Sequence, residues 1–269
     1  MDTLTALGTG YAVATRCFTT CFALSDGAET LLLDTGGGNG LLTNLERAGI
    51  GLASIRHVFV SHRHTDHILG VPWLVRMAAQ RLSRDDTGSL TIYCDPELVE
   101  GLMAMCAFML PQRLAGELGR RIVLQGVADG ETLMAGGWPL TFFDTGSIKD
   151  RQLGVSIVTK EGRRLVYLGD EPLRAAGEPY ARGADYLLHE AMCLYAESEQ
   201  YQPQRIAHSS VKEACANASR MEARALLLFH TEDRQLAVRK ERYIAEARRF
   251  YDGAIYVPDD LDVIPLVSL

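Results

Sequence analysis

Hydrophobic positions recur along the chain with two periods, one typical of strands and one typical of helices. Short apolar runs between turn residues predict strands at 3–7, 21–25, 30–34, 57–61, 90–94, 121–125, 139–143, 155–159, 164–169, 184–190 and 225–230. Helical spacing predicts helices at 40–49, 66–82, 96–109, 209–220 and 236–250. Strands and helices alternate at both ends, whereas strands follow one another in the middle. This order predicts one α/β domain over residues 1–269, with helices covering stacked sheets.

Composition indicates the cellular compartment in which we expect such a domain. The chain has 269 residues, 47% of them hydrophobic, which is enough to bury a core. Its longest apolar runs are too short and too interrupted for a membrane span, and its first residues lack the basic region of a signal peptide. The six cysteines form no C-x-x-C pair. We therefore expect a cytoplasmic protein without disulfides and without a membrane partner.

The charge balance bears on the choice of substrate. A net charge of −7 gives no overall attraction to a polyanion such as RNA. Arginine-rich stretches do occur, and the longest, at 239–250, is typical of the solvated face of an amphipathic helix. An RNA substrate would therefore need a local basic patch.

The strongest chemical signal is the stretch SHRHTDH at residues 61–67, directly after an apolar strand. Alternate side chains of an extended segment share a face, so His62 and His64 can converge on one ion. Asp66 and His67 are adjacent at a predicted helix start, so they point elsewhere. Histidine and aspartate are common zinc ligands. The spacing therefore predicts two neighbouring metal sites.

This motif and other segments resemble the metallo-β-lactamase superfamily, and within it the ribonuclease Z branch. LGTG at 7–10 and LLLDTGGG at 31–38 resemble the opening segments of the superfamily. VYLGD at 166–170 is similar to the motif with the metal-bridging carboxylate. Three later segments are similar to ribonuclease Z segments, namely LLHEA at 187–191, AHSS at 207–210 and LLLFHTED at 226–233. The resemblance implies a four-layer αββα sandwich with two zinc or similar ions at one edge.

The same resemblance implies which residues form the site. The implied metal ligands are His62, His64, Asp66, His67, Asp170 and His230, with Asp170 bridging the ions. Asp66, Glu190 and His208 are the implied catalytic residues. Asp66 would hold the proton of the nucleophile, while Glu190 and His208 would polarise the scissile phosphate and protonate its leaving oxygen. The implied cofactor is Zn²⁺, as one or two ions, with Mn²⁺ as an alternative.

Two acidic residues keep alternative interpretations. Asp34 follows a predicted strand, so it either caps the helix that begins near Asn39 or orients the metal ligands, as in the family. Asp144 precedes the position where family members carry one more histidine, which in this chain is Gly146. Because Asp144 shares the strand face of residue 146, it is a candidate substitute for that histidine.

Gly146, which replaces the family histidine, gives the two expected metal sites different numbers of ligands. The first site would contain three ligands, His62, His64 and Asp170. The second site would contain Asp66, His67, Asp170 and His230. We therefore expect the second site to bind metal more tightly than the first.

The resemblance implies a metal-dependent hydrolase that cleaves a phosphodiester with a metal-activated hydroxide. The segment between Gly146 and Asp170 is too short for the arm with which some ribonuclease Z proteins grip tRNA. A small phosphodiester or nucleotide-like substrate is therefore favoured over tRNA 3′ processing. Two other functions stay open, an ester, thioester or lactone hydrolase on the same fold and a non-catalytic binding protein with an incomplete metal site. The resemblance also implies a homodimer.

Overall fold

The computed structural model describes residues 1–84 and 88–267, which contain two mixed sheets of seven strands each. The first sheet consists of β1 (Thr3–Gly8), β2 (Cys21–Ser25), β3 (Thr30–Leu33), β4 (Ile55–Phe59), β5 (Leu90–Cys94), β6 (Ile122–Gly126) and β14 (Val263–Pro265). The second consists of β7 (Thr132–Ala135), β8 (Trp138–Asp144), β9 (Leu153–Val158), β10 (Arg164–Tyr167), β11 (Tyr186–Glu190), β12 (Ala225–Phe229) and β13 (Ala254–Tyr256). The strand orders are β14-β1-β2-β3-β4-β5-β6 and β13-β12-β11-β10-β9-β8-β7.

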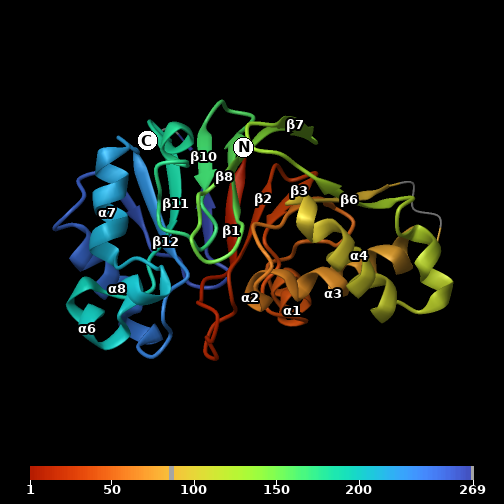
Figure 1. Ribbon diagram of the computed structural model, residues 1–269, viewed down its shortest axis with the longest axis horizontal. Coiled ribbons are helices and arrows are strands. Elements are labelled where there is room, and N and C mark those ends of the chain that lie inside the picture. Colours follow the sequence, from red (N-terminus) through yellow and green to blue (C-terminus); the bar gives the residue numbers. More distant parts are fainter. Residues whose placement is uncertain (85–87, 268–269) are drawn as a thin grey trace.

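Helices cover the outer face of each sheet, so the molecule has four layers (Figure 1). The helices beside the first sheet are α1 (Gly40–Arg47), α2 (Thr65–Ile68), α3 (Gly70–Leu82) and α4 (Pro96–Met109). Those beside the second sheet are α5 (Glu178–Ala181), α6 (Ser198–Tyr201), α7 (Val211–Arg220) and α8 (Leu236–Ala247). Short 3₁₀ helices occur at η1 (Gln112–Glu117), η2 (Tyr195–Glu197) and η3 (Pro203–Ile206).

Apolar side chains hold these layers together in three buried clusters of the described residues. The cluster between the sheets includes Phe22 and Phe59 from the first sheet and Tyr167 and Phe229 from the second. Phe22 meets Phe229 edge to face, with ring centroids 5.2 Å apart. Burial of each such side chain stabilises the fold by about 1.5–3 kcal/mol. The two sheets are therefore held face to face by aromatic packing.

The parallel parts of both sheets place polar residues at one edge. Strands β3 to β6 run parallel in the first sheet, and β10 to β13 run parallel in the second. Asp34 follows β3, Asp170 follows β10, and His230 follows β12 directly. The carboxyl ends of parallel strands are where open α/β sheets bind ligands. The topology thus brings residues that are far apart in sequence to one edge.

The predicted strands and helices are all present, with ends that differ by a few residues. The short strands β7, β13 and β14 were not predicted, because three or four residues carry too little periodicity. The helix predicted at 66–82 is divided into α2 and α3. The division has a local cause, since the Gly70 N–H donates to Gly36 O at 3.0 Å, and a Cβ at Gly70 would collide with the Thr35 backbone.

Two expectations from composition can be compared with the fold. In the described part of the chain, no helix has the length and apolarity needed to cross a membrane. All six cysteines are free, as expected from their spacing, and five of them are buried. Burial raises the pKa of the Cys94, Cys106 and Cys215 thiols to about 12, which disfavours the reactive thiolate.

Candidate metal centre

Four short segments bring the predicted ligands to the edge of the two sheets. His62 and His64 lie in the loop after β4, and His64 has extended backbone as the N-cap residue of α2. Asp66 and His67 lie in the first turn of that helix, so the end of the extended segment redirects them. His230 adopts a left-handed φ of 55°, an uncommon conformation for a side chain of this size. Such local strain is frequent at functional sites.

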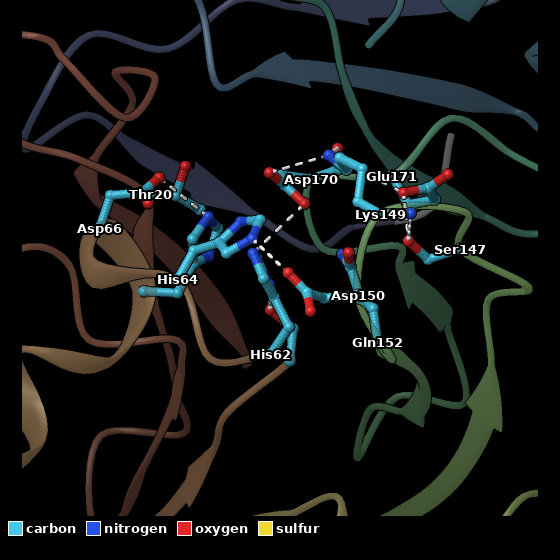
Figure 2. Close-up of polar contacts among 12 residues, drawn as sticks. Thr20, His62, His64, Asp66, Ser147, Lys149, Asp150, Gln152, Asp170 and Glu171 are labelled. Carbon is cyan, nitrogen blue, oxygen red and sulfur yellow. Dashed lines mark hydrogen bonds and ion pairs between the residues drawn. The ribbon is translucent and has the colours of Figure 1, made fainter. Parts of the chain in front are cut away.

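The ligand atoms form three overlapping groups among the described residues, and within each group they lie within 4.8 Å of one another. The groups are His62 with His67 and Asp170, Asp66 with His67 and His230, and Asp170 with His208 and His230. Asp170 belongs to the first and third groups, and its Oδ1 lies 3.5 Å from His62 Nε2 (Figure 2). Its Oδ2 lies 3.7 Å from His230 Nε2, and His67 and His230 join the second group to the other two. The arrangement therefore resembles one continuous cluster with Asp170 in a bridging position.

Each of the three central imidazoles is oriented through its Nδ1 atom. His62 Nδ1 lies 3.0 Å from Ser61 Oγ, and His230 Nδ1 lies 2.8 Å from Thr20 Oγ1. His67 Nδ1 lies 2.7 Å from Asp34 Oδ2. These contacts leave the Nε2 atoms of all three rings facing the cluster, where His67 Nε2 lies 3.1 Å from Asp66 Oδ2. A polar partner on one ring nitrogen is the usual way in which proteins orient a metal-binding histidine.

The burial of these groups fits a bound cation. His62, His67 and His230 are at most 1% exposed, and Asp66 and Asp170 are 3% and 2% exposed. Five buried atoms of the cluster have no hydrogen-bond partner within the described chain, namely His62 Nε2, Asp66 Oδ2, His67 Nε2, Asp170 Oδ1 and His208 Nδ1. Buried polar atoms without partners are costly unless another group satisfies them. Divalent metal ions held by the ligand groups to which these residues belong would satisfy the His62, Asp66, His67 and Asp170 atoms.

The electrostatics of the cluster also favour a cation. Burial lowers the pKa of His67, but the Asp34 and Asp66 carboxylates outweigh burial and raise it well above its usual range. Burial lowers the pKa of His62, and it lowers the pKa of His230 to about 3, so both rings are neutral and able to ligate. Burial opposes ionisation of Asp170, but neighbouring imidazoles and Lys149 hold its pKa well below the usual range. Ionised aspartates beside the neutral His62 and His230 rings suit a divalent ion, and His67 would have to release its proton to bind one.

Asp34 orients the ligands rather than capping a helix. Its buried carboxylate accepts hydrogen bonds from the Ser61 N–H at 2.7 Å and from the Tyr167 hydroxyl at 2.5 Å, besides its contact with His67. The N-cap of α1 is Asn39, and no side chain caps that helix. The capping alternative for Asp34 is therefore wrong. Because Tyr167 belongs to the second sheet, Asp34 also connects the two sheets at the site.

We expect Asp34→Asn to weaken metal binding by about 10- to 100-fold. The amide keeps the shape of the side chain and tolerates the left-handed φ of 56° at this position, but it places less negative charge beside His67. Competition with a chromogenic chelator measures the change. Asp26→Asn, at a turn remote from the cluster, is the matched control, and an equal loss in both variants would contradict the assignment.

In the loop at 142–154, Asp144 does not take the role of the missing histidine for which it was a candidate. Asp144 accepts a hydrogen bond from the Gly146 N–H at 2.7 Å, so its carboxylate closes the turn instead of replacing the missing histidine. Gly146 has a φ of 71°, and a Cβ there would lie 3.3 Å from Ala176 Cβ. A histidine at this position would therefore be strained.

His64 belongs to none of the three ligand groups within the described residues. Its Nε2 lies 3.0 Å from Asp150 Oδ2 (Figure 2). The structure groups His62 with His67 and Asp170, and the pairing of His62 and His64 on one ion stays a prediction. The residues after His64 turn into α2, so the His67 ring lies 4.2 Å from the His62 ring between centroids, close to the 4.4 Å between His62 and His64. Sequence reasoning missed Asp150 and its neighbour Lys149, although both are charged residues in the segment with the missing histidine.

Glu190 and His208 lie beside the same cluster. His208 Nδ1 is 3.6 Å from Glu190 Oε2, and His208 Nε2 is 4.0 Å from Asp170 Oδ2. Glu190 Oε1 accepts a hydrogen bond from the Ser209 N–H at 2.5 Å, which positions the segment that carries His208. Burial lowers the pKa of His208, but Glu190 outweighs burial and raises it. The pair can therefore present a protonated imidazole toward the cluster.

Fold and cluster together define a metallo-hydrolase architecture, and the comparisons with known proteins identify the family. A model described as the beta-lactamase superfamily domain matches residues 29–231. The ribonuclease Z of Halorubrum lacusprofundi is 30% identical, with 97% of this chain and 96% of the relative covered. That of Natronomonas pharaonis is 28% identical, with 98% and 97% covered. The chain belongs to the beta-lactamase superfamily.

Solved structures support the same fold. The metallo-beta-lactamase fold protein YhfI from Bacillus subtilis has a TM-score of 0.78 at 20% identity, covering 98% of this chain and 100% of that one. The short form of human tRNase Z has a TM-score of 0.73 at 22% identity, and all of both chains is covered. The expected αββα fold and the resemblance to ribonuclease Z are therefore confirmed. This fold implies a divalent metal ion.

Proposed function

We propose that this protein is a hydrolase of small phosphodiesters that uses Zn²⁺, or alternatively Mn²⁺, bound by the cluster around Asp170. The prediction of a metal-dependent phosphodiester hydrolase agrees with the full-length relatives named ribonuclease Z. The observation that carries the proposal is the position of Glu190 and His208, whose paired side chains face Asp170 at the edge of the ligand cluster. Cleavage of a phosphodiester is helped by a general acid that protonates the leaving oxygen beside the metal cluster, and His208 is in position for this role.

The proposed ligands divide into a principal and a weaker set. Asp66, His67, Asp170 and His230 form the principal set, and His62 and His64 add to Asp170 for a second ion. The principal set would hold a divalent ion, which would supply Lewis-acid activation of water and of the phosphate. Asp66 accepts the proton of the attacking water, and His208 donates a proton to the leaving oxygen. Glu190 holds His208 in the protonated form and in position.

Three observations support a small substrate. A pocket of about 420 Å³ lies beside His208, and Ile148, Arg174, Gln204 and Glu213 line it. This volume suits a single nucleotide-like group. The residues between Gly146 and Asp170 form the hairpin of β9 and β10, so they supply no arm for tRNA. The alignment with the Halorubrum relative runs over 317 residues, so that relative has segments that this chain of 269 residues lacks.

RNA is the second candidate substrate, because the curated relatives are named ribonuclease Z. A substrate panel tests the proposal directly. We expect turnover of bis(p-nitrophenyl) phosphate with Zn²⁺ or Mn²⁺, little turnover of p-nitrophenyl acetate or a lactone, and weak cleavage of a tRNA precursor with a 3′ trailer. Turnover of esters alone would reject phosphodiester hydrolysis, and efficient precursor cleavage would assign RNA as the substrate. No turnover with a filled metal site would favour a binding protein.

Three broader features complete the proposal. Residues 1–269 form one hydrolase domain, in agreement with the continuous sheets that both chain halves build. The protein acts in the cytoplasm, in agreement with its free cysteines. It acts as a homodimer, which rests on the resemblance to ribonuclease Z. Sedimentation of the purified chain tests the dimer.

A further inference from the structure

The pocket beside His208 is the part of the site that would hold the leaving group. His208 lines this pocket of about 420 Å³, and its Nε2 lies 4.0 Å from Asp170 Oδ2 in the metal cluster. The pocket and the cluster therefore share one imidazole. A general acid has to lie within hydrogen-bond reach of the oxygen that it protonates. Because His208 is the proposed acid, the leaving group would occupy the pocket on its side of the site.

The lining of this pocket favours polar recognition of its occupant. Among the described residues, the His208 ring is the only aromatic side chain in the lining. The pocket therefore offers no further ring on which a base could stack. Its other charged side chains are Arg174 and Glu213, and Gln204 and Asn217 add amide groups. Charge and hydrogen bonds, rather than stacking, would select the group that enters.

Arg174 is fixed by one edge of its guanidinium group. Its Nε donates to Glu171 Oε1 at 2.5 Å, and Glu171 is fully buried. Within the described parts of the chain, the two terminal nitrogens of Arg174 make no hydrogen bond, and its side chain is 29% exposed. A guanidinium held in this way presents a planar fork that suits phosphate or carboxylate. A phosphate monoester carries about −1.5 to −2 charges and three acceptor oxygens, more of both than a carboxylate.

Glu171 does not neutralise Arg174 alone. Its Oε2 accepts a hydrogen bond from the Ser147 hydroxyl at 2.8 Å and lies 3.8 Å from Lys149 Nζ (Figure 2). One buried carboxylate thus faces two cations on this side of the pocket. Arg174 therefore keeps positive charge and free donors for an anion.

Glu213, the carboxylate in the lining, already has partners for both oxygens. Its Oε2 accepts hydrogen bonds from the Ser210 N–H at 2.7 Å and from the Ser210 hydroxyl at 2.9 Å, which closes the capping box of α7. Its Oε1 accepts a hydrogen bond from Gln204 Nε2 at 2.9 Å. The carboxylate is therefore committed to the start of the helix, and Arg174 is the charged group of the lining with donors to spare.

We propose that this pocket binds a leaving group that carries its own phosphate, and that Arg174 binds this phosphate through its terminal nitrogens. The inference rests on the proposed phosphodiester hydrolysis and narrows its substrates to diesters whose leaving alcohol is itself phosphorylated. Water forms a bond to the phosphorus of the diester and gives a proton to Asp66, while the bond to the leaving oxygen breaks and that oxygen takes a proton from His208. The second phosphate stays intact, and Arg174 stays protonated throughout.

Binding of the expected leaving group tests the inference without catalysis. Zinc-loaded wild type, Arg174→Met and Arg174→Lys are titrated by calorimetry with thymidine 5′-phosphate and with glycerol 3-phosphate, and thymidine and glycerol are the phosphate-free probes. We expect Arg174→Met to weaken binding of the phosphates by about 10- to 100-fold, because it removes hydrogen bonds to a charged group. Arg174→Lys keeps the charge but not the fork, so its loss should be smaller.

Arg242→Met is the matched control for these titrations. Arg242 also pairs with a glutamate and is similarly exposed, but it lies outside the pocket. A loss of affinity for both phosphates in Arg174→Met supports the inference, and a loss for one alone assigns the leaving group to the nucleotide or to the non-nucleotide source. Equal Kd values in wild type and Arg174→Met for both phosphates would overturn it.

The kinetic arm uses a thymidine dinucleotide without a terminal phosphate and the same dinucleotide with one at its 5′ or its 3′ end. The measured quantity is the ratio of kcat/KM with and without the terminal phosphate, which cancels any general loss in a variant. We expect wild type and Arg242→Met to favour one phosphorylated form by at least about tenfold, and this ratio to fall near one in Arg174→Met.

Two kinetic outcomes would contradict the inference, namely no preference in wild type or an unchanged ratio in Arg174→Met. Absence of turnover of the dinucleotides and of bis(p-nitrophenyl) phosphate in every variant would instead reject phosphodiester hydrolysis. The titrations would then still decide whether Arg174 binds a phosphate.

Discussion

Asp170→Asn is expected to abolish tight metal binding and to lower phosphodiester hydrolysis by about 1,000-fold or more. The physical reason is that both carboxylate oxygens serve the site, with Oδ1 facing His62 Nε2 at 3.5 Å and Oδ2 facing His230 Nε2 at 3.7 Å. Asparagine keeps the shape but removes the anion shared by these groups. Bound metal after dialysis and kcat on bis(p-nitrophenyl) phosphate measure the two effects.

Thermal unfolding separates loss of metal binding from loss of folding. A ligand that binds only the native state raises its stability, by about 2.7 kcal/mol at a concentration 100 times Kd. Zn²⁺ should therefore raise the Tm of wild type but not that of Asp170→Asn. Asp185→Asn is the matched control, because Asp185 precedes β11 at the opposite end of the strands and accepts a hydrogen bond from the Arg164 N–H. A zinc-dependent rise in the Tm of Asp170→Asn equal to that of wild type would contradict the bridging assignment.

His208→Ala is expected to slow hydrolysis of a phosphodiester with an alkoxide leaving group by about 100- to 10,000-fold. The effect on bis(p-nitrophenyl) phosphate should be much smaller, because p-nitrophenolate leaves without a proton. The ratio of the two losses is the measurement that identifies a proton donor. His57→Ala is the control, since His57 lies on β4 and contacts the Tyr93 hydroxyl outside the cluster. Equal losses on both substrates would assign His208 to binding or structure instead.

The pH dependence of the alkoxide substrate provides a second test of the same pair. Glu190 outweighs burial and raises the pKa of His208, so the imidazolium is present below this raised pKa and is lost as pH rises through it. The rate on the alkoxide substrate should therefore fall on the alkaline side. Glu190→Gln removes the carboxylate and should move this fall to lower pH. A profile with the same alkaline limb in wild type and Glu190→Gln would contradict the pairing.

The core elements of the fold were predictable because their signals are local. The helix from Pro96 to Met109 has an aspartate cap, a proline in its first turn and a continuous apolar face, and it was predicted with its observed ends. Strands β2 and β5 were likewise predicted residue for residue. The edge strands β13 and β14 were not, since each has three residues that become strands only by pairing with β12 and β1. Their structure depends on neighbours that are distant in the sequence.

The site was predictable in its residue types but only partly in its geometry. The spacing in SHRHTDH identified a metal-binding segment, yet the pairing of His62 with His64 was inferred from extended backbone that ends at His64. The helix that begins at Thr65 brings His67 beside His62 as well, and only His67 shares a ligand group with it among the described residues. Similarly, Asp144 shares a strand face with residue 146 in the sequence, but its side chain turns back onto the Gly146 N–H. Side-chain directions in such loops depend on hydrogen bonds that no periodicity describes.

The sequence by itself determined the order of the helices and of all strands except β7, β13 and β14, the residue types of the metal cluster and the shortness of the segment between Gly146 and Asp170, since all three follow from local patterns and lengths. Only the tertiary structure decided that Asp34 holds His67 rather than a helix, that His67 groups with His62, and that Lys149 occupies one side of Asp170. These contacts join residues from different strands and loops. Their geometry arises only when the carboxyl ends of two stacked sheets meet at one edge.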